Sequence, residues 1–574
     1  MQKRLWTVGA PLALAALVFL LYLFASSRST LWDRDEPRFA AASAEMLSSG
    51  NYLYPIFNGN LRPDKPILIY WLMTLPLRWW GPTELACRFF SVLGTVAVCV
   101  LTYLCGRRLF SAGAGLWAMA IVASTPMMAG AGTAATADAV LLACITAAAT
   151  VFLYSLRTRF ALPHALLLAL ALGAALLDKG PVGLAVALPA IAGTWWFARG
   201  RIQPGRHGIL NVLLATLAAC FIFLCWAVPA DRATGGEFLR QFLGHHVGDR
   251  MTMPLEHHGG NLLLMLPFYV PVLVVLFLPW TLFLPGALSA LLGRRLAGTP
   301  GKWFLLSWLV PLFVIMSLVA TKLPHYILPV WPALALAVAG TIDAHERGLL
   351  NARDYKWLRR GAWLAAPFAF VMAVLLLAGP ATPAALQMMA GTFRLSAQFK
   401  ASLQACTVIL SSQRWPCAVA GAGLAIVAVL VLWQYLALRI KAAAIACFAG
   451  TVGLQLFCAG FILPAVEKLK ITEPLARAIR SRVPDAEPVV TCGYSEPSLN
   501  FYLHRRVVRE LPHAEAVIEW AKEAQPGVLI VPREVLVRIQ RRHGVLLLQE
   551  IASAIGFNYP KGKWCELVAM HRGP

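Results

Sequence analysis

The sequence has few charged residues, and most of them carry one sign. Only 13% of its 574 residues are charged, compared with about a quarter in soluble domains, and 59% are hydrophobic. There are 50 Lys and Arg against 27 Asp and Glu, a formal charge of +23. The basic residues occur in short clusters between apolar runs of about 20 residues, which is typical of positive-inside topology and excludes a nucleic-acid-binding surface. We therefore predict a polytopic α-helical membrane protein.

Several motifs of other protein classes are absent. The sequence has no P-loop, which argues against an ATPase, and no CxxC pair among its 12 Cys, which argues against a metal or redox framework. Cys406 and Cys417 fall in one expected outer loop, where a disulfide and two free thiols are both possible readings. The first apolar run has no convincing small-residue cleavage site, so we expect an uncleaved first helix.

The apolar runs and the Lys/Arg clusters predict about thirteen membrane helices. Because the clusters fall on alternate loops, the N-terminus is expected inside and the C-terminus outside. The expected spans are residues 8–25, 85–106, 112–130, 137–155, 161–177, 181–198, 209–229, 262–285, 303–320, 327–342, 362–379, 416–437 and 443–464.

The composition divides the chain into two parts. Residues 1–464 form the expected transmembrane part, with a long first outer loop over residues 26–82. That loop is expected to contain short helices near 36–49 and 67–80, the second of them apolar and suited to the membrane interface. Residues 465–574 are mixed and polar. Strands near 488–492, 527–531 and 565–570, with helices near 473–482, 497–503 and 513–524, predict a small outer α/β domain.

Carboxylates are concentrated at the start of the first outer loop. Asp33, Asp35 and Glu36 occupy three of four consecutive positions beside the membrane. Such groups can bind a substrate hydroxyl or amine, act as a base, or hold a metal. The plainer reading is a solvated loop whose acids favour the first turn of the following helix. Asp138, at the start of the span 137–155, has the same two readings.

Four cations lie on the expected outer side, where the positive-inside bias does not explain them. They are Lys65, Lys179, Arg250 and Lys322. Each alone is explained by interfacial snorkelling or, for Lys179, by pairing with the neighbouring Asp178. Together they predict an anionic ligand at the outer leaflet, such as a lipid phosphate. His245 and His246, with Asp64, form a weak candidate metal site, because adjacent histidines are poor evidence for a metal.

The first outer loop contains Asp35-Glu36-Pro37-Arg38, Glu45-Met46-Leu47, Gly50-Asn51-Tyr52, Pro55, Asn58-Gly59, Asp64-Lys65-Pro66 and Tyr70-Trp71. This pattern resembles the opening loop of the polyprenyl-phosphate-sugar glycosyltransferases, which have the GT-C fold. The likeness extends to chain length, helix number and the outer C-terminal domain, and within the class it is to the aminoarabinose transferases (ArnT) of Gram-negative bacteria. Many members have Glu where this chain has Asp64, which puts the role of that side chain in doubt.

The resemblance implies an inverting glycosyltransferase in the bacterial inner membrane. Such an enzyme moves 4-amino-4-deoxy-L-arabinose from undecaprenyl phosphate to lipid A phosphates on the periplasmic face, which gives polymyxin resistance. No cofactor is expected, and a divalent metal is the alternative. The implied roles are catalytic for Asp35, Glu36 and Asp138, donor-phosphate binding for Lys65, Arg250, Tyr326 and Arg38, and cavity lining for Lys179 and Lys322.

Two alternatives stay open on the sequence. A sibling transferase would use another sugar, or a protein or glycan acceptor, and would share the same opening loop. A transporter of anionic lipids would instead require charged residues in the middle of spans and paired broken helices. The charges lie mainly at the outer ends of the spans, which favours an enzyme working at the outer face.

Overall fold

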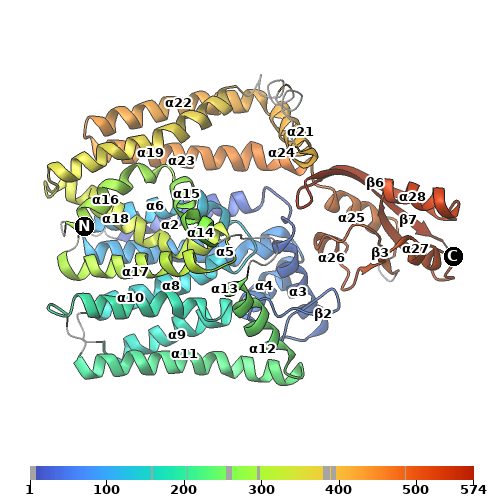
Figure 1. The fold of residues 1–574 in the computed structure, drawn as a ribbon, viewed down its shortest axis with the longest axis horizontal. Coiled ribbons are helices and arrows are strands. Elements are labelled where there is room, and N and C mark those ends of the chain that lie inside the picture. The colour runs from blue at the N-terminus through green and yellow to red at the C-terminus, as the bar shows by residue number, and fades with distance from the viewer. Residues whose placement is uncertain are drawn as a thin grey trace.

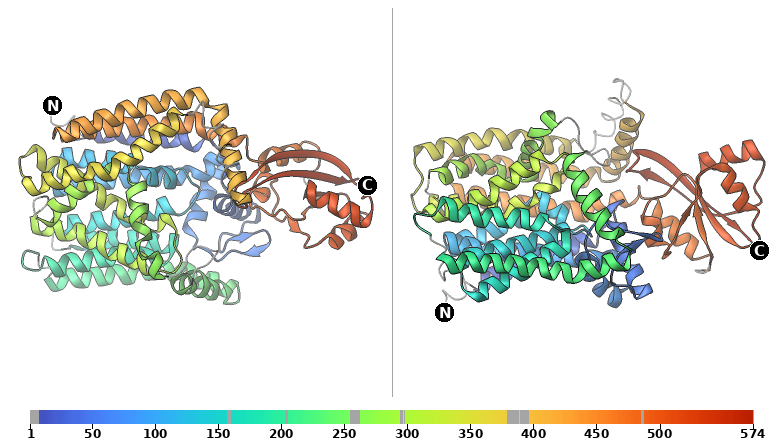
Figure 2. Two further views of the ribbon diagram at one scale, coloured as in Figure 1. Left: turned by 45° about the horizontal axis from the view of Figure 1, so that its top comes forward. Right: turned by 60° about the horizontal axis from the view of Figure 1, so that its bottom comes forward.

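The computed structural model describes residues 8–156, 160–202, 205–253, 262–293, 296, 298–378, 388, 396–484 and 487–573. A bundle of roughly parallel and antiparallel helices makes up most of the molecule, and a small α/β domain lies beyond one end of it (Figure 1). The N-terminus lies at the opposite end of the bundle, as the two further views also show (Figure 2). The elements of the first outer loop lie between the bundle and this domain.

The bundle helices occur where the apolar runs predict them. Among the described residues, nine helices are long and apolar enough to cross a membrane, and two bent pairs bring this to eleven. Two shorter apolar helices, α2 and α10, complete the set, and the count of thirteen crossings stays a prediction. The bundle comprises α2 (Ala10–Ser26), α5 (Glu84–Leu109), α6 (Ala112–Ser124), α7 (Pro126–Gly132), α8 (Asp138–Ser155), α9 (Leu162–Lys179), α10 (Val182–Phe197), α11 (Gly205–Ala233), α14 (Leu262–Met265), η3 (Leu266–Phe268), α15 (Tyr269–Leu276), η4 (Trp280–Phe283), α16 (Leu284–Leu292), α17 (Gly298–Leu318), η5 (Pro324–Val330), α18 (Trp331–Glu346), α19 (Ala352–Leu377), α22 (Arg414–Leu436), α23 (Ile440–Phe457), η6 (Cys458–Ile462) and α24 (Leu463–Glu467).

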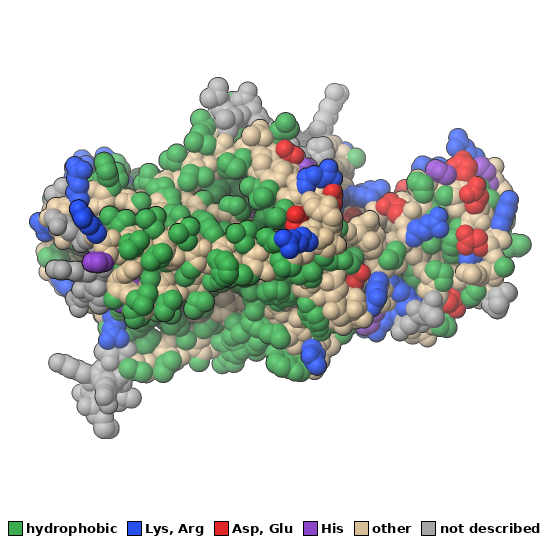
Figure 3. All heavy atoms as spheres, turned by 90° about the horizontal axis from the view of Figure 1, so that it is seen from below, with side chains coloured by type: hydrophobic (Ala, Val, Ile, Leu, Met, Phe, Trp, Pro, Cys, Tyr) green, Lys and Arg blue, Asp and Glu red, His purple; other side chains and the backbone are tan. Residues whose placement is uncertain are grey.

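The surface of the bundle is apolar. Hydrophobic side chains cover a broad band of it, whereas charged side chains gather toward its two ends and on the α/β domain (Figure 3). Large side chains such as Phe221 of α11 and Trp363 of α19 are 67% and 83% exposed. Apolar patches of this extent are rare on soluble proteins, but lipid solvates them at no cost. The chain is therefore a multi-pass membrane protein.

The two bent pairs have no charged residue. α6 and α7 meet at 68°, and the segments Leu266–Leu276 and Trp280–Leu292 meet at 110°. Both stretches consist of apolar and small residues. The broken helices of transporters direct polar backbone and charge at a substrate in the middle of the membrane. These bent pairs therefore lack the charged residues that the transporter alternative requires at a helix break.

The disulfide reading of the cysteines is wrong. Cys406 lies exposed on α21 (Ala397–Ser412), whereas Cys417 is buried on α22, and both are free thiols. The two residues lie on opposite sides of the break between these helices at Gln413.

The first outer loop has regular structure along much of its length. Helix α3 (Asp35–Ser49) is followed by a hairpin of β1 (Ile56–Phe57) and β2 (Asn60–Leu61), and then by α4 (Leu68–Trp80). Asn58 and Gly59 connect the two strands with φ of 53° and 77°. This left-handed pair is the usual sequence for a two-residue hairpin turn. The hairpin was not expected from the sequence, although the Asn-Gly pair is a recognised signal for one.

Short elements between the long helices lie at the same end of the bundle (Figure 1). After α11 the chain forms α12 (Glu237–Gln241), a π-helix η2 (Phe242–Asp249) and α13 (Arg250–Thr252). π-Helical turns are rare and often occur at functional sites. The segment brings His246 next to Asp64 and Arg250 near Lys65, both of the first outer loop.

The C-terminal domain is an α/β domain built on one five-stranded sheet in the order β4-β3-β5-β7-β6. β3 pairs in parallel with β4 and β5, whereas β7 is antiparallel to both β5 and β6. β4, β6 and α28 were not anticipated from the sequence. The elements are α25 (Thr472–Arg480), β3 (Val489–Thr491), α26 (Ser498–Tyr502), β4 (Arg509–Glu510), α27 (Ala514–Ala521), β5 (Gly527–Pro532), α28 (Arg533–His543), β6 (Gln549–Asn558) and β7 (Lys563–Arg572).

The C-terminal domain and the first outer loop share one hydrophobic core. Leu31, Phe39 and Tyr70 of the loop segment belong to the same buried cluster as Leu475 of α25 and Leu499 of α26. Burial of side chains of this size contributes about 1.5–3 kcal/mol each. The domain is thus packed onto the loop rather than connected to the bundle only through the chain.

Candidate functional site

Asp35 is the exposed carboxylate of the acidic run. It is the first residue of α3, so the free N–H groups of the first helical turn favour its negative charge. The carboxylate is close enough to Arg62 and His325 for electrostatic interaction with both. Asp35 is therefore accessible from outside and faces the charged groups of the loops around it.

Glu36 has a different environment from its neighbour, which corrects its predicted catalytic role. Its side chain is 3% exposed and forms a two-pronged ion pair with Arg88 of α5, at 2.9 Å to Nε and 2.7 Å to Nη2. The backbone N–H groups of Trp32 and Ala135 donate to the same carboxylate at 2.7 and 2.6 Å. Burial alone raises the pKa of such a group, but Arg88 and these donors hold it below its usual value. With both oxygens occupied, Glu36 anchors the start of α3 and does not face substrate.

Lys65 stands at the centre of a group of cations. It follows the hairpin, and its ammonium donates to the carbonyl of Asp64 at 3.0 Å. Burial, together with the positive charges of Lys179 and Arg250, lowers the pKa of Lys65 to about 8. An anion would relieve the mutual repulsion of these three cations, so they are a candidate anion site.

Lys179, at the end of α9, pairs with Asp138, at the start of α8. Thr136 donates to the other oxygen of Asp138 at 3.2 Å, and the Lys179 ammonium lies 6.0 Å from the centre of the Tyr326 ring. Arg250 donates from Nη1 to the Tyr326 hydroxyl oxygen at 3.1 Å. The Tyr326 hydroxyl hydrogen is thereby left to donate to a ligand. These predicted site residues lie together although they come from four separate segments of the chain.

The candidate metal ligands do not converge. His246 contacts Asp64 at 3.1 Å, but His245 turns away to Asp249 at 3.0 Å. Asp64 also pairs with the buried Arg62 at 2.9 Å. Within the described ranges there is no group of three or more His, Cys, Asp or Glu side chains that could hold a metal ion. The predicted set of His245, His246 and Asp64 is therefore wrong as a metal site.

His246 instead forms part of the polar wall around Lys65. Burial lowers the pKa of His246 to about 4, with Lys65 and Arg250 acting in the same direction, so its ring is neutral at pH 7. Burial acts to raise the pKa of Asp64, but Arg62 and His246 hold it below its usual value. Arg38, on the first turns of α3, also acts electrostatically on Asp64. Arg38 thus lies near enough to this wall to act on Asp64.

Lys322 does not belong to the cation group, which corrects its predicted cavity role. Its side chain is 4% exposed, and its ammonium donates to the carbonyls of Met316 and Ser317 at 3.0 and 2.5 Å. These are carbonyls of the last turn of α17, which a helix leaves unpaired. Lys322 therefore caps a helix end. The position of Lys322 in the sequence does not show whether its ammonium points to the helix end or to the cation group.

Some residues of the site were missed in the sequence. His325 interacts electrostatically with Asp138, Lys179 and Asp35 and so connects the two acidic groups. Arg88 holds Glu36 and also donates to the carbonyls of Ser26, Ser29 and Thr30. An arginine near the end of an apolar span was the available signal, since charges there are costly unless they are used.

Sequence comparison relates the chain to lipid-linked-sugar transferases. A family model described as dolichyl-phosphate-mannose-protein mannosyltransferase matches residues 64–226, a segment that contains Lys65, Asp138 and Lys179. The undecaprenyl phosphate-α-4-amino-4-deoxy-L-arabinose arabinosyl transferase of Edwardsiella ictaluri is 33% identical over 339 residues, 58% of this chain and 59% of that protein. A transferase of the same description from Proteus mirabilis is 30% identical over 345 residues, 59% and 60% of the two chains. The matched part thus spans about three fifths of the length of these relatives.

Structural comparison covers nearly the whole chain. The crystal structure of ArnT from Cupriavidus metallidurans bound to undecaprenyl phosphate superposes with a TM-score of 0.74 at 20% sequence identity. The match covers 98% of this chain and 99% of that one. The chain has the ArnT fold. The GT-C architecture expected from the first outer loop is thereby confirmed.

Proposed function

We propose that this protein is an ArnT-type glycosyltransferase, which transfers 4-amino-4-deoxy-L-arabinose from undecaprenyl phosphate to a phosphate group of lipid A. The observation that carries the proposal is the grouping of Lys65, Lys179 and Arg250, with the exposed Asp35 linked to them through Arg62 and His325, on a chain with the ArnT fold. The curated relatives are described as acting with undecaprenyl phosphate-linked aminoarabinose, which supplies the donor class.

The cation group suits the leaving group of this reaction. When the bond from the sugar C1 to the phosphate oxygen of the donor breaks, that oxygen keeps the electron pair and gains negative charge. Lys65 and Arg250 stabilise this charge, and Tyr326 adds a hydroxyl donor that is oriented by Arg250. Donors fixed in place before the reaction supply several kcal/mol of barrier reduction. Lys179 also carries a positive charge here, but much of it is balanced by Asp138.

The acceptor and the sugar meet near Asp35. A phosphate oxygen of lipid A is already ionised, so it forms the new bond to C1 without a strong base, and the configuration at C1 inverts. Asp35 lies exposed at the edge of the cation group and stabilises positive charge that develops on the sugar ring. With a hydroxyl acceptor the same carboxylate would instead remove a proton. No metal is required, because the cationic side chains supply the positive charge that the leaving group needs.

The site is proposed to lie on the periplasmic side of the inner membrane. A cluster of Arg347, Arg353, Lys356, Arg359 and Arg360 lies at and after the junction of α18 and α19, on the loop expected to be cytoplasmic. The C-terminal domain and the first outer loop lie at one end of the bundle and the N-terminus at the other (Figure 1). The positive-inside bias supports a cytoplasmic N-terminus and a periplasmic C-terminal domain.

The proposal is tested by complementation of a bacterium that lacks its own aminoarabinose transferase but still makes the donor. Wild type should restore polymyxin survival and add the aminoarabinose mass to lipid A, because the amino sugar masks phosphate charge. Asp35→Asn and Lys65→Ala, expressed at wild-type levels, should restore neither. Lys356→Ala, on the opposite end of the bundle, is the control and should behave as wild type.

The outcome also separates the alternatives. Unmodified lipid A in cells that contain folded wild-type protein would contradict the aminoarabinose assignment. A sibling transferase would then be indicated by a mass increase on another glycan or protein that disappears with Asp35→Asn. A transporter would alter the distribution of the lipid-linked sugar across the membrane without covalent modification of any acceptor.

A further inference from the structure

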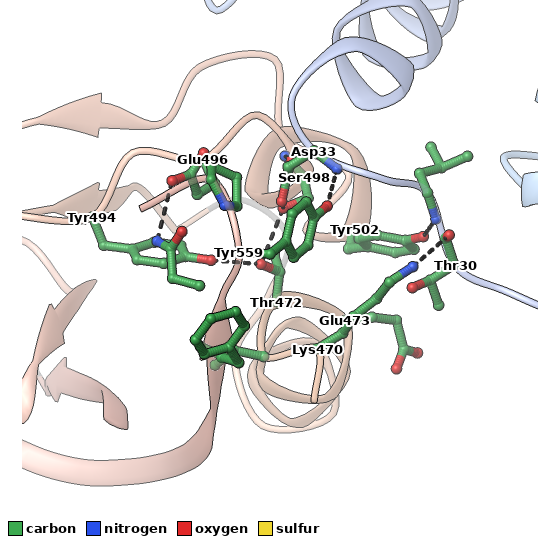
Figure 4. A pocket seen from close by; sticks show the side chains of 15 residues that line it. Thr30, Asp33, Lys470, Thr472, Glu473, Tyr494, Glu496, Ser498, Tyr502 and Tyr559 are labelled. Atoms are coloured by element: carbon green, nitrogen blue, oxygen red, sulfur yellow. Dashed lines mark hydrogen bonds between the residues drawn. The ribbon is translucent and has the colours of Figure 1, made fainter. Parts of the chain in front are cut away.

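The segment before Asp35 is held by the C-terminal domain. Figure 4 shows residues of this domain surrounding Thr30 and Asp33, in a pocket lined by both parts of the chain. Ser498, the first residue of α26, donates from its backbone N–H to Asp33 Oδ1 at 2.9 Å and from its hydroxyl to Oδ2 at 2.6 Å. The Asp33 backbone N–H in turn donates to the Tyr559 hydroxyl oxygen. Asp33 is thus hydrogen-bonded to the C-terminal domain through both its side chain and its backbone.

The residues on either side of Asp33 are held in the same way. Lys470 donates to the Thr30 carbonyl at 2.8 Å, and its ammonium lies 4.1 Å from the centre of the Trp32 ring. The Leu31 backbone N–H donates to the Tyr502 hydroxyl at 2.7 Å. The Trp32 ring packs edge-on against Tyr559, with the ring centres 5.6 Å apart. Each residue from Thr30 to Asp33 therefore contacts the C-terminal domain or the segment that leads into it.

The Ser498 hydroxyl that binds Asp33 is itself held by further hydrogen bonds inside the C-terminal domain. Ser498 Oγ lies 3.0 Å from Thr472 Oγ1, and Thr472 lies 2.9 Å from the Tyr494 hydroxyl. Ser498 and Thr472 are both buried, so these hydroxyls lack the competing water that would let them reorient freely. A short chain of hydrogen bonds therefore runs from the interior of the C-terminal domain to Asp33, two residues before Asp35.

We propose that Ser498 is a positioning residue for Asp35, acting from the C-terminal domain through Asp33. Ser498 holds Asp33 on one side and Arg88 holds Glu36 on the other, so the backbone that carries Asp35 is bound to neighbouring elements at both ends. A shift of about 1 Å in a reacting group costs up to about 100-fold in rate. The inference rests on the proposed function and gives the C-terminal domain a part in the reaction.

The test compares Ser498→Ala with wild type, using purified full-length protein, undecaprenyl phosphate-linked aminoarabinose and lipid A. We expect kcat to fall about 10-fold and KM for the donor to change less than about twofold. Binding of the donor is unaffected because Lys65, Lys179 and Arg250 lie on other segments. Ser481→Ala is the matched control: Ser481 is exposed in the same domain just after α25, its hydroxyl donates to the carbonyl of Ala478, and kcat should not change.

A double-mutant cycle separates positioning from general loss of structure. In an Asp33→Ala background, adding Ser498→Ala should not lower kcat further, because the connection between the two residues is already broken. All rates are taken per folded molecule, measured by size-exclusion chromatography. An unchanged kcat in Ser498→Ala, or losses that multiply in the double variant, would overturn the inference.

The failure of this inference can be distinguished from failure of the proposed function. If wild type transfers no aminoarabinose, the proposed function fails. If wild type is active and Ser498→Ala is equally active, only the positioning role fails, and the C-terminal domain needs no part in the reaction.

Discussion

Glu36 and Asp35 are adjacent acids with opposite environments, and their substitutions should have opposite effects. Glu36→Gln removes the charge that faces Arg88. Its amide NH2 group takes the place of one carboxylate oxygen and so faces N–H donors, such as those of Trp32 and Arg88 that bind Oε2 in the wild type. The Arg88 side chain is only 1% exposed, so its charge would remain buried without an anion. Breaking a buried ion pair from one side costs about 3–5 kcal/mol. This is a large part of a total stability of about 5–15 kcal/mol.

Asp35→Asn should leave stability nearly unchanged. The side chain is exposed at the start of α3, and substitutions at such sites change stability by about 0.5 kcal/mol or less. The same change removes the charge expected to act on the sugar ring. We therefore expect a folded protein with almost no transfer activity.

The assay measures both properties on the same preparations. Each variant is heated in detergent, and the fraction that remains folded is read by size-exclusion chromatography, while transfer is measured per folded molecule at low temperature. Glu36→Gln should lose its folded fraction at a clearly lower temperature than wild type, and Glu36→Gln with Arg88→Met should recover part of the loss, since apolar replacement of a whole pair is better tolerated. If Glu36→Gln keeps wild-type thermal stability but loses transfer, the assignment of Glu36 as a structural anchor is refuted.

Two further predictions concern Lys65 and Lys322, and a third concerns metal dependence. Because burial, Lys179 and Arg250 lower the pKa of Lys65 to about 8, the free enzyme loses this charge as pH rises through 8, so kcat/KM for the donor should fall above that pH in wild type. Lys65→Arg keeps the charge, and the same fall in that variant would contradict the assignment. Lys322→Met should lower stability by about 1 kcal/mol by uncapping α17 while leaving KM for the donor unchanged, and a large rise in KM would place Lys322 at the donor after all. Transfer by enzyme treated with EDTA should equal that of untreated enzyme, and a loss that added Zn²⁺ or Mg²⁺ reverses would contradict the metal-free mechanism.

Much of the helical part was predictable because apolar runs near 20 residues have one stable arrangement in lipid. The helices of the first outer loop were also predictable, from the polar-to-apolar pattern around 36–49 and 67–80. β6 was not, since Gln549–Asn558 pairs only with β7 and leaves Ile555 exposed. The pattern of such an edge strand is set by its partner and not by its own residues. α28 (Arg533–His543) is rich in Arg and has no long apolar run, so its own sequence is a weak signal for a helix.

The site was predictable as a set of residue types but not as a set of contacts. Asp35 and Glu36 look alike in the sequence, and only the position of Arg88, 52 residues further along, makes one of them structural. Lys65 and Lys322 both stand at the outer ends of apolar segments, yet one faces other cations and the other faces helix carbonyls. The orientation of a long side chain depends on its neighbours in space, and the sequence gives no distance between them. The contacts of Asp33 with Ser498 join residues 465 positions apart.

The central claim is most directly tested by the mass of lipid A after incubation with the purified protein in proteoliposomes. The reaction contains undecaprenyl phosphate-linked 4-amino-4-deoxy-L-arabinose as the only sugar donor. The account predicts that lipid A gains one aminoarabinosyl unit per phosphate modified, that undecaprenyl phosphate is released in equal amount, and that Asp35→Asn produces neither. Lipid A of unchanged mass with folded wild-type protein, or equal modification by Asp35→Asn, would contradict it.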